Sequence, residues 1–210
     1  MRLPRFHHGA ILAGLLALAS APALATTVMQ FNLAEMTDRA DRIFRGRILS
    51  ATEGTVDVGG GQLPIVTYRV QVDEAFLGDV TTVKGVRIAE IRMLGKVASI
   101  RHGNLRRVSP LPEMPQLRVG QTYLLFATRP SAIGLSTTVG LGQGFFAISS
   151  VGKDEVALNG ANNSGLFRGM DAGAPAARAA RTAAAPDSGA VAYVELASRV
   201  RALVASRGAR

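Results

Sequence analysis

The sequence predicts a mainly β protein, a small antiparallel β-barrel with one short N-terminal helix and an amphipathic C-terminal helix. Three observations support this fold class. Several segments alternate apolar and polar residues between turns rich in glycine and proline. Only two segments space their apolar residues as a helix does. Strands and helices do not alternate along the chain, so a parallel sheet is not expected.

Residues 1–25 have the layout of a secretory signal peptide. Arg2 and Arg5 give a basic start, an apolar run follows from Ala10 to Ala19, and an Ala-Leu-Ala sequence ends at Ala25. The apolar run is roughly half the length of about 20 residues that a membrane-spanning helix needs. We therefore expect export to the periplasm or the outside, with cleavage after Ala25 and a mature chain that starts at Thr26.

The first helix is predicted just after this start. Asn32 is a good N-cap, and Glu35 stands three residues later, as in a capping box. Leu33, Met36 and Ala40 then share one face of a short helix.

Four strands follow. Residues 42–58 form an unusually long one, and Gly46 and Gly54 inside it predict bulges or a sharp bend. After a flexible glycine-rich tip at 59–64, residues 64–76 alternate cleanly, which predicts a half-buried strand. Its apolar face is expected to carry Val66, Tyr68, Val70 and Val72. Residues 83–93 and 121–129 are the third and fourth predicted strands.

Gly142 and Gly144 fit the pattern G-x-G-x-x-A of nucleotide-binding turns. That site needs a helix that opens at the glycines. Residues 145–159 instead alternate around a turn at 152–154, which predicts a β-hairpin. The glycines are therefore interpreted as a bend into a strand, and no cofactor is expected.

Composition narrows the function classes. The chain contains no cysteine, so a hydrophobic core alone must stabilise it, and thiol chemistry is excluded. Of three histidines, only His102 lies beyond the predicted signal peptide, and no metal site is expected. The formal net charge is +9, but the arginines are scattered among acids. A nucleic-acid partner is therefore not expected in an exported protein.

The C-terminal part changes in composition. Residues 171–190 are rich in alanine, proline, glycine and arginine and are predicted to be a disordered linker. Residues 191–207 form the amphipathic helix, with Tyr193, Leu196, Ala197, Val200, Leu203 and Val204 on one face. The helix is expected to dock on the domain or pair with another chain; membrane-surface binding is the alternative. Residues 26–170 are expected to fold without it.

The domain resembles the netrin-like domain of tissue inhibitors of metalloproteinases. Three segments carry the resemblance: ADRIFRGRILSATE (40–53), IVTYRVQVDEAFLGD (65–79) and LRVGQTYLLFA (117–127). The resemblance covers about residues 26–150 and implies an OB-like barrel. The chain also resembles a set of exported bacterial proteins that share TTVGLGQG (137–144) and NNSGLF (162–167).

The resemblance implies a partner and a mechanism. The inhibitors bind a protease zinc through the α-amine and carbonyl of an N-terminal cysteine that a disulfide holds. Here Thr26 would present these groups, with Thr27 and Val28 beside it, but no disulfide is available. We expect a non-enzymatic protein-binding domain, an inhibitor or partner of an exported metalloprotease. The alternatives are a small-ligand or glycan-binding module of the envelope and a hydrolase.

Other charged groups are weaker candidates. Arg101, His102, Arg106 and Arg107 lie in one loop that either binds an anion or is simply solvated, and His102 is the one residue that a hydrolase would use. The remaining polar groups are expected to be solvated turns or tips: the pair Asp73 and Glu74, and the set Asp154, Glu155 and Asn159. Residues 162–164 form a glycosylation sequon that is expected to be unused.

Overall fold

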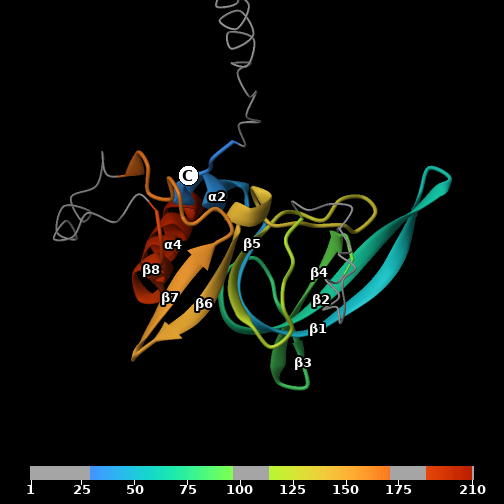
Figure 1. Ribbon diagram of the computed structural model, residues 1–210, viewed down its shortest axis with the longest axis horizontal. Coiled ribbons are helices and arrows are strands. Elements are labelled where there is room, and N and C mark those ends of the chain that lie inside the picture. The colour runs from blue at the N-terminus through green and yellow to red at the C-terminus, as the bar shows by residue number, and fades with distance from the viewer. Residues whose placement is uncertain (1–28, 97–113, 171–187, 210) are drawn as a thin grey trace, which may run out of the picture.

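The computed structural model describes residues 29–96, 114–170 and 188–209 (Figure 1). The predicted signal peptide and most of the predicted linker lie outside these residues. The elements follow in the order α2 (Leu33–Arg39), β1 (Arg42–Val58), β2 (Gly61–Leu77), β3 (Thr81–Val83), β4 (Val86–Leu94), β5 (Thr122–Ala127), the 3₁₀ turn η1 (Leu141–Gln143), β6 (Phe145–Val151), β7 (Asp154–Asn159), β8 (Val191–Ala192) and α4 (Tyr193–Gly208).

All eight strands belong to one antiparallel sheet with the order β3-β4-β2-β1-β5-β6-β7-β8. The mainly β fold class with two helices is thus confirmed. The sheet is not closed, because β3 and β8 are its two ends, and the predicted barrel is only an approximate description. A closed barrel buries one side of its strands in one interior. Here β1 and β5 bury side chains on both sides.

The two sides of the sheet carry two separate cores. The helix-side core lies between the sheet and the two helices and includes Leu33, Met36, Ile43, Leu124, Phe126, Phe146, Ile148, Leu196 and Val200. The second core lies on the opposite side and includes Phe44, Ile48, Val66, Tyr68, Val70, Val72, Ile91, Met93 and Leu125. Successive residues of a strand point to opposite sides, so Ile43 and Phe44 enter different cores.

The local signals at the first helix are confirmed. The Asn32 side chain accepts a hydrogen bond from the Glu35 N–H at 2.8 Å, and the Glu35 carboxylate accepts one from the Asn32 N–H at 2.8 Å. This capping box fixes where α2 begins, and Leu33 and Met36 are fully buried. The predicted apolar face of β2 is likewise buried, from Val66 to Val72.

The irregularity predicted in the long strand is confirmed around Gly46. The pairing of β1 with β2 shifts register between Ile43 and Phe44, between Arg45 and Gly46, and between Ile48 and Ser50. No shift occurs at Gly54. Such bulges re-aim the side chains that follow them. They turn the end of β2 so that Phe76 packs against the helix-side core, whereas Val72 packs in the second core.

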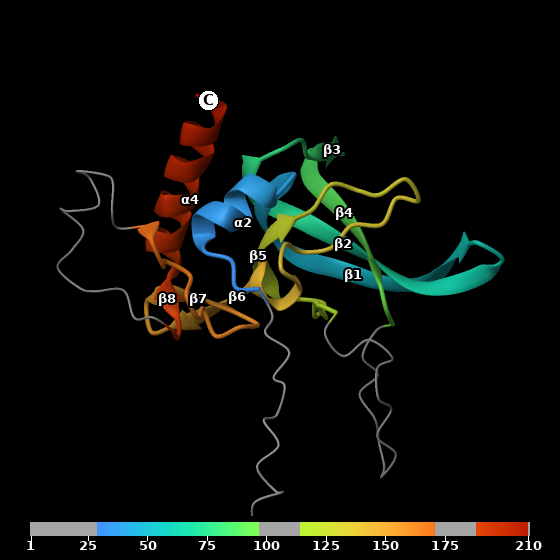
Figure 2. The same ribbon diagram turned by 90° about the horizontal axis from the view of Figure 1, so that it is seen from above.

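The C-terminal helix docks on the domain. It lies beside α2 and packs over the end of the sheet that contains β6 and β7 (Figures 1 and 2). Its apolar face enters the helix-side core with the buried residues Tyr193, Leu196, Ala197 and Val200. Arg207 donates hydrogen bonds to the carbonyls of Thr37 (2.9 Å) and Ala40 (2.8 Å) at the end of α2. The core thus continues past Met170, the predicted end of the domain.

The glycines of the apparent nucleotide motif do not precede an α-helix. Gly142 lies inside the 3₁₀ turn η1, Gly144 caps its end, and β6 begins directly afterwards at Phe145. A side chain at Gly144 would place its Cβ 2.3 Å from the Val139 carbonyl oxygen, so the tight approach of two backbone segments requires glycine there. Among the described residues, no helix has the length and apolar character to cross a membrane.

Candidate functional site

The most prominent surface feature is an arm, which we define as residues 52–64 of the β1–β2 ribbon. β1 pairs with β5 only from Arg42 to Arg47, and β2 pairs with β4 only from Ile65 to Gln71. The ribbon therefore continues past both neighbouring strands and projects from the body (Figures 1 and 2). Within the arm, β1 and β2 pair with each other up to the turn.

The tip of the arm has the sequence of a tight hairpin. Gly59 and Gly60 have φ values of 56° and 90°, and a two-residue turn of the favoured type needs positive φ at both positions. Two apolar residues flank the turn, Val58 and Leu63, with exposed fractions of 40% and 39%. Val56 pairs with Leu63 across the ribbon, and all three side chains lie on one face.

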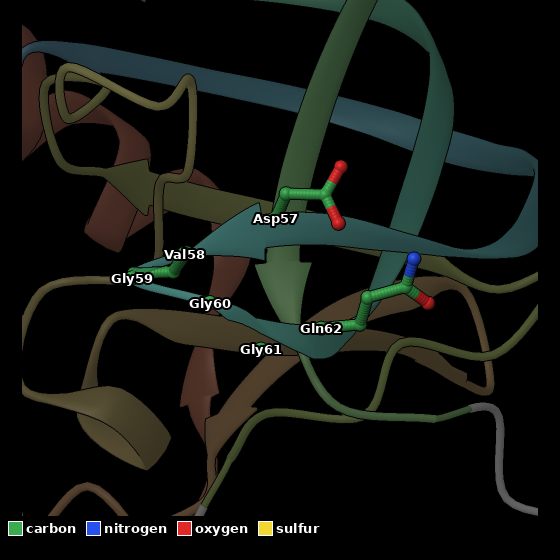
Figure 3. A pocket seen from close by; sticks show the side chains of 6 residues that line it. All are labelled: Asp57, Val58, Gly59, Gly60, Gly61 and Gln62. Atoms are coloured by element: carbon green, nitrogen blue, oxygen red, sulfur yellow. The ribbon is translucent and has the colours of Figure 1, made fainter.

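The opposite face of the tip is polar. Asp57 and Gln62 are cross-strand partners, and both side chains project from the ribbon beside the glycine turn (Figure 3). An open pocket is lined by the six residues from Asp57 to Gln62. The arm therefore presents an apolar stripe on one face and hydrogen-bonding groups on the other.

The site residues predicted from the sequence lie outside the described residues. This holds for Thr26, Thr27 and Val28, and also for the candidate anion-binding residues Arg101, His102, Arg106 and Arg107.

The chain directly after the predicted N-terminus is firmly held. The Gln143 side-chain amide accepts a hydrogen bond from the Phe31 N–H (2.8 Å) and donates one to the Met29 carbonyl (2.9 Å). Phe31 packs against the helix-side core, and Arg39 stacks on its ring with Cζ 4.7 Å from the centroid. Gln143, which lies between Gly142 and Gly144, therefore anchors the N-terminal segment.

Two buried asparagines connect this anchor to the C-terminal region. Asn159 donates from its side chain to the Gln143 carbonyl (3.0 Å). Asn163 accepts from the Asn159 N–H (2.9 Å) and donates to the carbonyls of Ala157 (2.9 Å) and Gly189 (2.8 Å). The stretches 137–144 and 162–167, which share no local sequence signal, thus meet in one hydrogen-bonded cluster. Asn159 is not part of a solvated hairpin tip, because its side chain is buried and bonded.

A charged network lies under α4. Arg45 forms a two-pronged ion pair with Glu155, at 2.8 and 2.7 Å. Its guanidinium also lies over the Tyr193 ring, with Cζ 4.4 Å from the centroid. The Tyr193 hydroxyl donates to Glu74 (2.8 Å), which also pairs with Arg201. Glu74 and Glu155 are therefore not solvated turn residues; they link strands to each other and to the helix.

The network shifts the pKa values of its members. Burial by itself raises the pKa of Glu74, but hydrogen bonds from Arg201 and Tyr193 and the charges of Arg201 and Arg45 outweigh it. The pKa of this carboxyl therefore lies below its ordinary value. Burial and the hydrogen bond to Glu74 raise the pKa of Tyr193 well above its ordinary value. Both shifts favour the protonation states that hold α4 on the sheet at neutral pH.

We expect acid to weaken this attachment. Because the folded-state pKa of Glu74 is lowered, its contribution to stability is complete above the ordinary value of 4.5 and is lost as the pH falls through the lowered pKa. Glu74→Gln should lower stability at neutral pH and flatten the loss on acidification. Urea unfolding at several pH values measures both effects, with Asp154→Asn as the control on an exposed acid of the same sheet. Parallel pH curves for wild type and Glu74→Gln would contradict the expectation.

These groups were not identified as a site from the sequence. Gln143, Asn163 and Arg45 have no local signal in the sequence. Each forms a side-chain hydrogen bond with a residue more than 20 positions away. The arm had a sequence signal: an unusually long predicted strand, followed by a glycine-rich tip and a second predicted strand. Among the described residues, no group of three acids or histidines is placed to hold a metal ion.

Comparison of the chain with protein-family models, with curated proteins and with solved structures finds no match.

Proposed function

We propose that this chain is an exported, non-enzymatic protein-binding domain and that the arm is its contact surface. The observation that carries the proposal is the position of Val58 and Leu63, at the end of a ribbon that leaves the body, with about two fifths of each side chain exposed. Burying such side chains in an interface is favourable by about 25 cal/mol per Å² of apolar area. Projection from the body gives a partner access to both faces of the ribbon.

Site-specific photo-crosslinking tests the contact. A photoreactive amino acid at position 58, introduced into the protein in its native cell envelope, is expected to yield one defined crosslinked species. Position 86 on β4 is the matched control, because Val86 is also a strand valine, with 41% exposure, but lies outside the arm, next to the turn that joins β3 and β4. Equal crosslinking at both positions, or none at position 58, would remove the arm as the contact surface.

The finer proposal is that the partner is an exported metalloprotease. The segment Thr26–Val28 would reach the protease zinc through its free α-amine, whose pKa near 7.7–8.0 leaves a usable neutral fraction. Ordering each backbone residue costs about 1–2 kcal/mol. Because Gln143 holds the chain from Met29 to Phe31, this cost falls on no more than the three residues before Met29. That anchor supports the proposal where a disulfide is lacking.

We expect weak inhibition that depends on the first residue. Intact mass should first establish Thr26 as the start of the native protein. The Thr26 form should then inhibit an exported metalloprotease at least tenfold better than a form with one extra N-terminal alanine, because the extra residue displaces the α-amine. Gln143→Ala should weaken inhibition as well. Equal potency of the two forms would remove the zinc-binding mechanism while leaving the arm proposal intact.

A specific observation favours the second candidate function, a small-ligand or glycan-binding module. A pocket of about 350 Å³ lies between β1, β2, β3 and β4 and is lined by charged residues of both signs, Arg42, Arg69, Asp79 and Glu90. Ligand pockets are typically about 300–1,000 Å³. If the chain binds a ligand there, Arg69→Ala should abolish ligand binding without changing crosslinking from position 58. A hydrolase that uses His102 is the third candidate.

A further inference from the structure

We propose that the pocket between β1, β2, β3 and β4 binds a zwitterion, a free α-amino acid with an apolar side chain. The inference rests on the second candidate function, in which this pocket takes a small ligand, and it specifies the chemical class of that ligand. It is independent of the arm.

Part of the pocket lining is apolar. Val83 and Ile88 line it together with the charged residues. Ile88 is only 8% exposed, yet among the described residues it is grouped with neither core. It lies on the opposite side of β4 from Ile91 and Met93, which pack in the second core. Ile88 therefore offers an apolar surface to the side chain of a ligand.

Two arginines reach the pocket from different strands. Arg42 donates a hydrogen bond from one terminal nitrogen to the Glu90 backbone carbonyl at 3.1 Å, and within the described part of the chain its other N–H groups have no partner. Arg69 stands directly opposite Glu90 on the neighbouring strand. Both arginines are therefore placed at the same position of β4. Two guanidinium groups around one point suit a carboxylate, which accepts charge-assisted hydrogen bonds from both.

Two carboxylates line the same pocket. Glu90 projects from β4 on the same side as Ile88, two residues away. Asp79 follows Gly78, which lies against Arg42: a Cβ at Gly78 would be 2.7 Å from Arg42 Cγ. An ammonium group has three N–H donors and can bond to more than one carboxylate.

The four charged groups are not paired with one another. Of the ion pairs within the described ranges of the chain, none includes Arg42, Arg69, Asp79 or Glu90. Each of these charges can therefore pair with a ligand without first breaking an ion pair inside the protein.

The mixture of charges selects the ligand class. An anion without a positive group would be repelled by the two carboxylates, and a cation without a negative group would be repelled by the two arginines. A zwitterion satisfies both sets. The volume of about 350 Å³ is at the lower end of the range for ligand pockets, about 300–1,000 Å³, which favours one small molecule over a glycan chain.

The probe is L-leucine. It is compared with N-acetyl-L-leucine, which lacks the ammonium group, and with L-leucine amide, which lacks the carboxylate. Isothermal titration calorimetry with the full mature chain should show that L-leucine binds at least tenfold more tightly than either derivative, because each derivative leaves one set of pocket charges without a partner. Equal affinities of the three compounds, or no binding of L-leucine, would overturn the proposal.

Matched variants test each end of the ligand. Asp79→Asn changes the charge of an exposed side chain but hardly its shape. It should weaken the binding of L-leucine at least tenfold and leave that of N-acetyl-L-leucine within about twofold. Arg69→Gln should weaken the binding of both compounds at least tenfold, because both carry the carboxylate. Asp154→Asn, on an exposed acid of β7, is the control and should change neither. Equal losses of both compounds in Asp79→Asn would contradict the pairing of this acid with the ammonium group.

The outcomes separate this inference from the functions proposed above. Tighter binding of acetate or glucose than of L-leucine, abolished by Arg69→Ala, would keep the pocket as a ligand site and overturn the zwitterion. Absence of crosslinking from position 58 would remove the arm as the contact surface and would leave the leucine titration unchanged.

Discussion

A chain that ends at Met170 is expected to lose its cooperative unfolding transition. Removal of the C-terminal region takes Val191, Tyr193, Leu196 and Val200 out of the helix-side core. Each large buried apolar side chain contributes about 1.5–3 kcal/mol, so four of them match the whole net stability of a typical domain, about 5–15 kcal/mol. This outcome is the opposite of the one that composition alone suggested, in which the domain up to Met170 folds by itself.

A point substitution separates packing from the other effects of truncation. Leu196→Ala should lower the free energy of unfolding by about 3 kcal/mol, because Leu196 is fully buried and the substitution leaves a cavity. Val194→Ala, two residues away in the same helix but 75% exposed, should change it by no more than about 0.5 kcal/mol. Urea unfolding followed by circular dichroism measures both. A truncated chain that melts cooperatively near the wild-type temperature would show that α4 is dispensable.

The second large effect is expected from Asn163→Ala. The substitution removes the acceptor of the Asn159 N–H and the donor to the carbonyls of Ala157 and Gly189. A buried polar group without a partner costs about 1–3 kcal/mol. Asn163 also has φ of 54°, a left-handed conformation that asparagine adopts more readily than alanine. The expected loss is about 4 kcal/mol.

The adjacent asparagine provides the matched control. Asn162 has almost the same backbone conformation, with φ of 55°, but its side chain is exposed. Asn162→Ala should therefore cost only the backbone component, about 1 kcal/mol. The difference of about 3 kcal/mol between the two variants isolates the buried hydrogen bonds. Similar losses for both would mean that backbone conformation alone explains the role of Asn163.

Local patterns explain why part of the fold was predictable. The capping box at Asn32 and Glu35 joins residues three apart, and the alternation from Val66 to Val72 follows from the two-residue repeat of a strand. The hairpin of β6 and β7 was predicted because no helical pattern follows Gly144. These features depend on neighbours within a few residues, and a single sequence displays them directly.

The candidate site was only partly predictable. The glycine tip and the long first strand were predicted, but how far the arm projects depends on where β4 and β5 stop pairing. Glu74 was interpreted as a solvated turn residue. A strand bulge turns it toward Tyr193 and Arg201, and a bulge position of this kind has no signal in the alternation pattern.

By itself, the sequence determined the β-rich class, the two helices and the positions of the main strands, because hydrophobic periodicity and capping are local and act on each element separately. Only the tertiary structure decided that the sheet stays open, that α4 belongs to the core and that Gln143, Asn159 and Asn163 form one cluster. The physical reason is that each of these features joins groups distant in sequence. Their free energy depends on which surfaces meet after the strands have paired, and no local pattern encodes that choice.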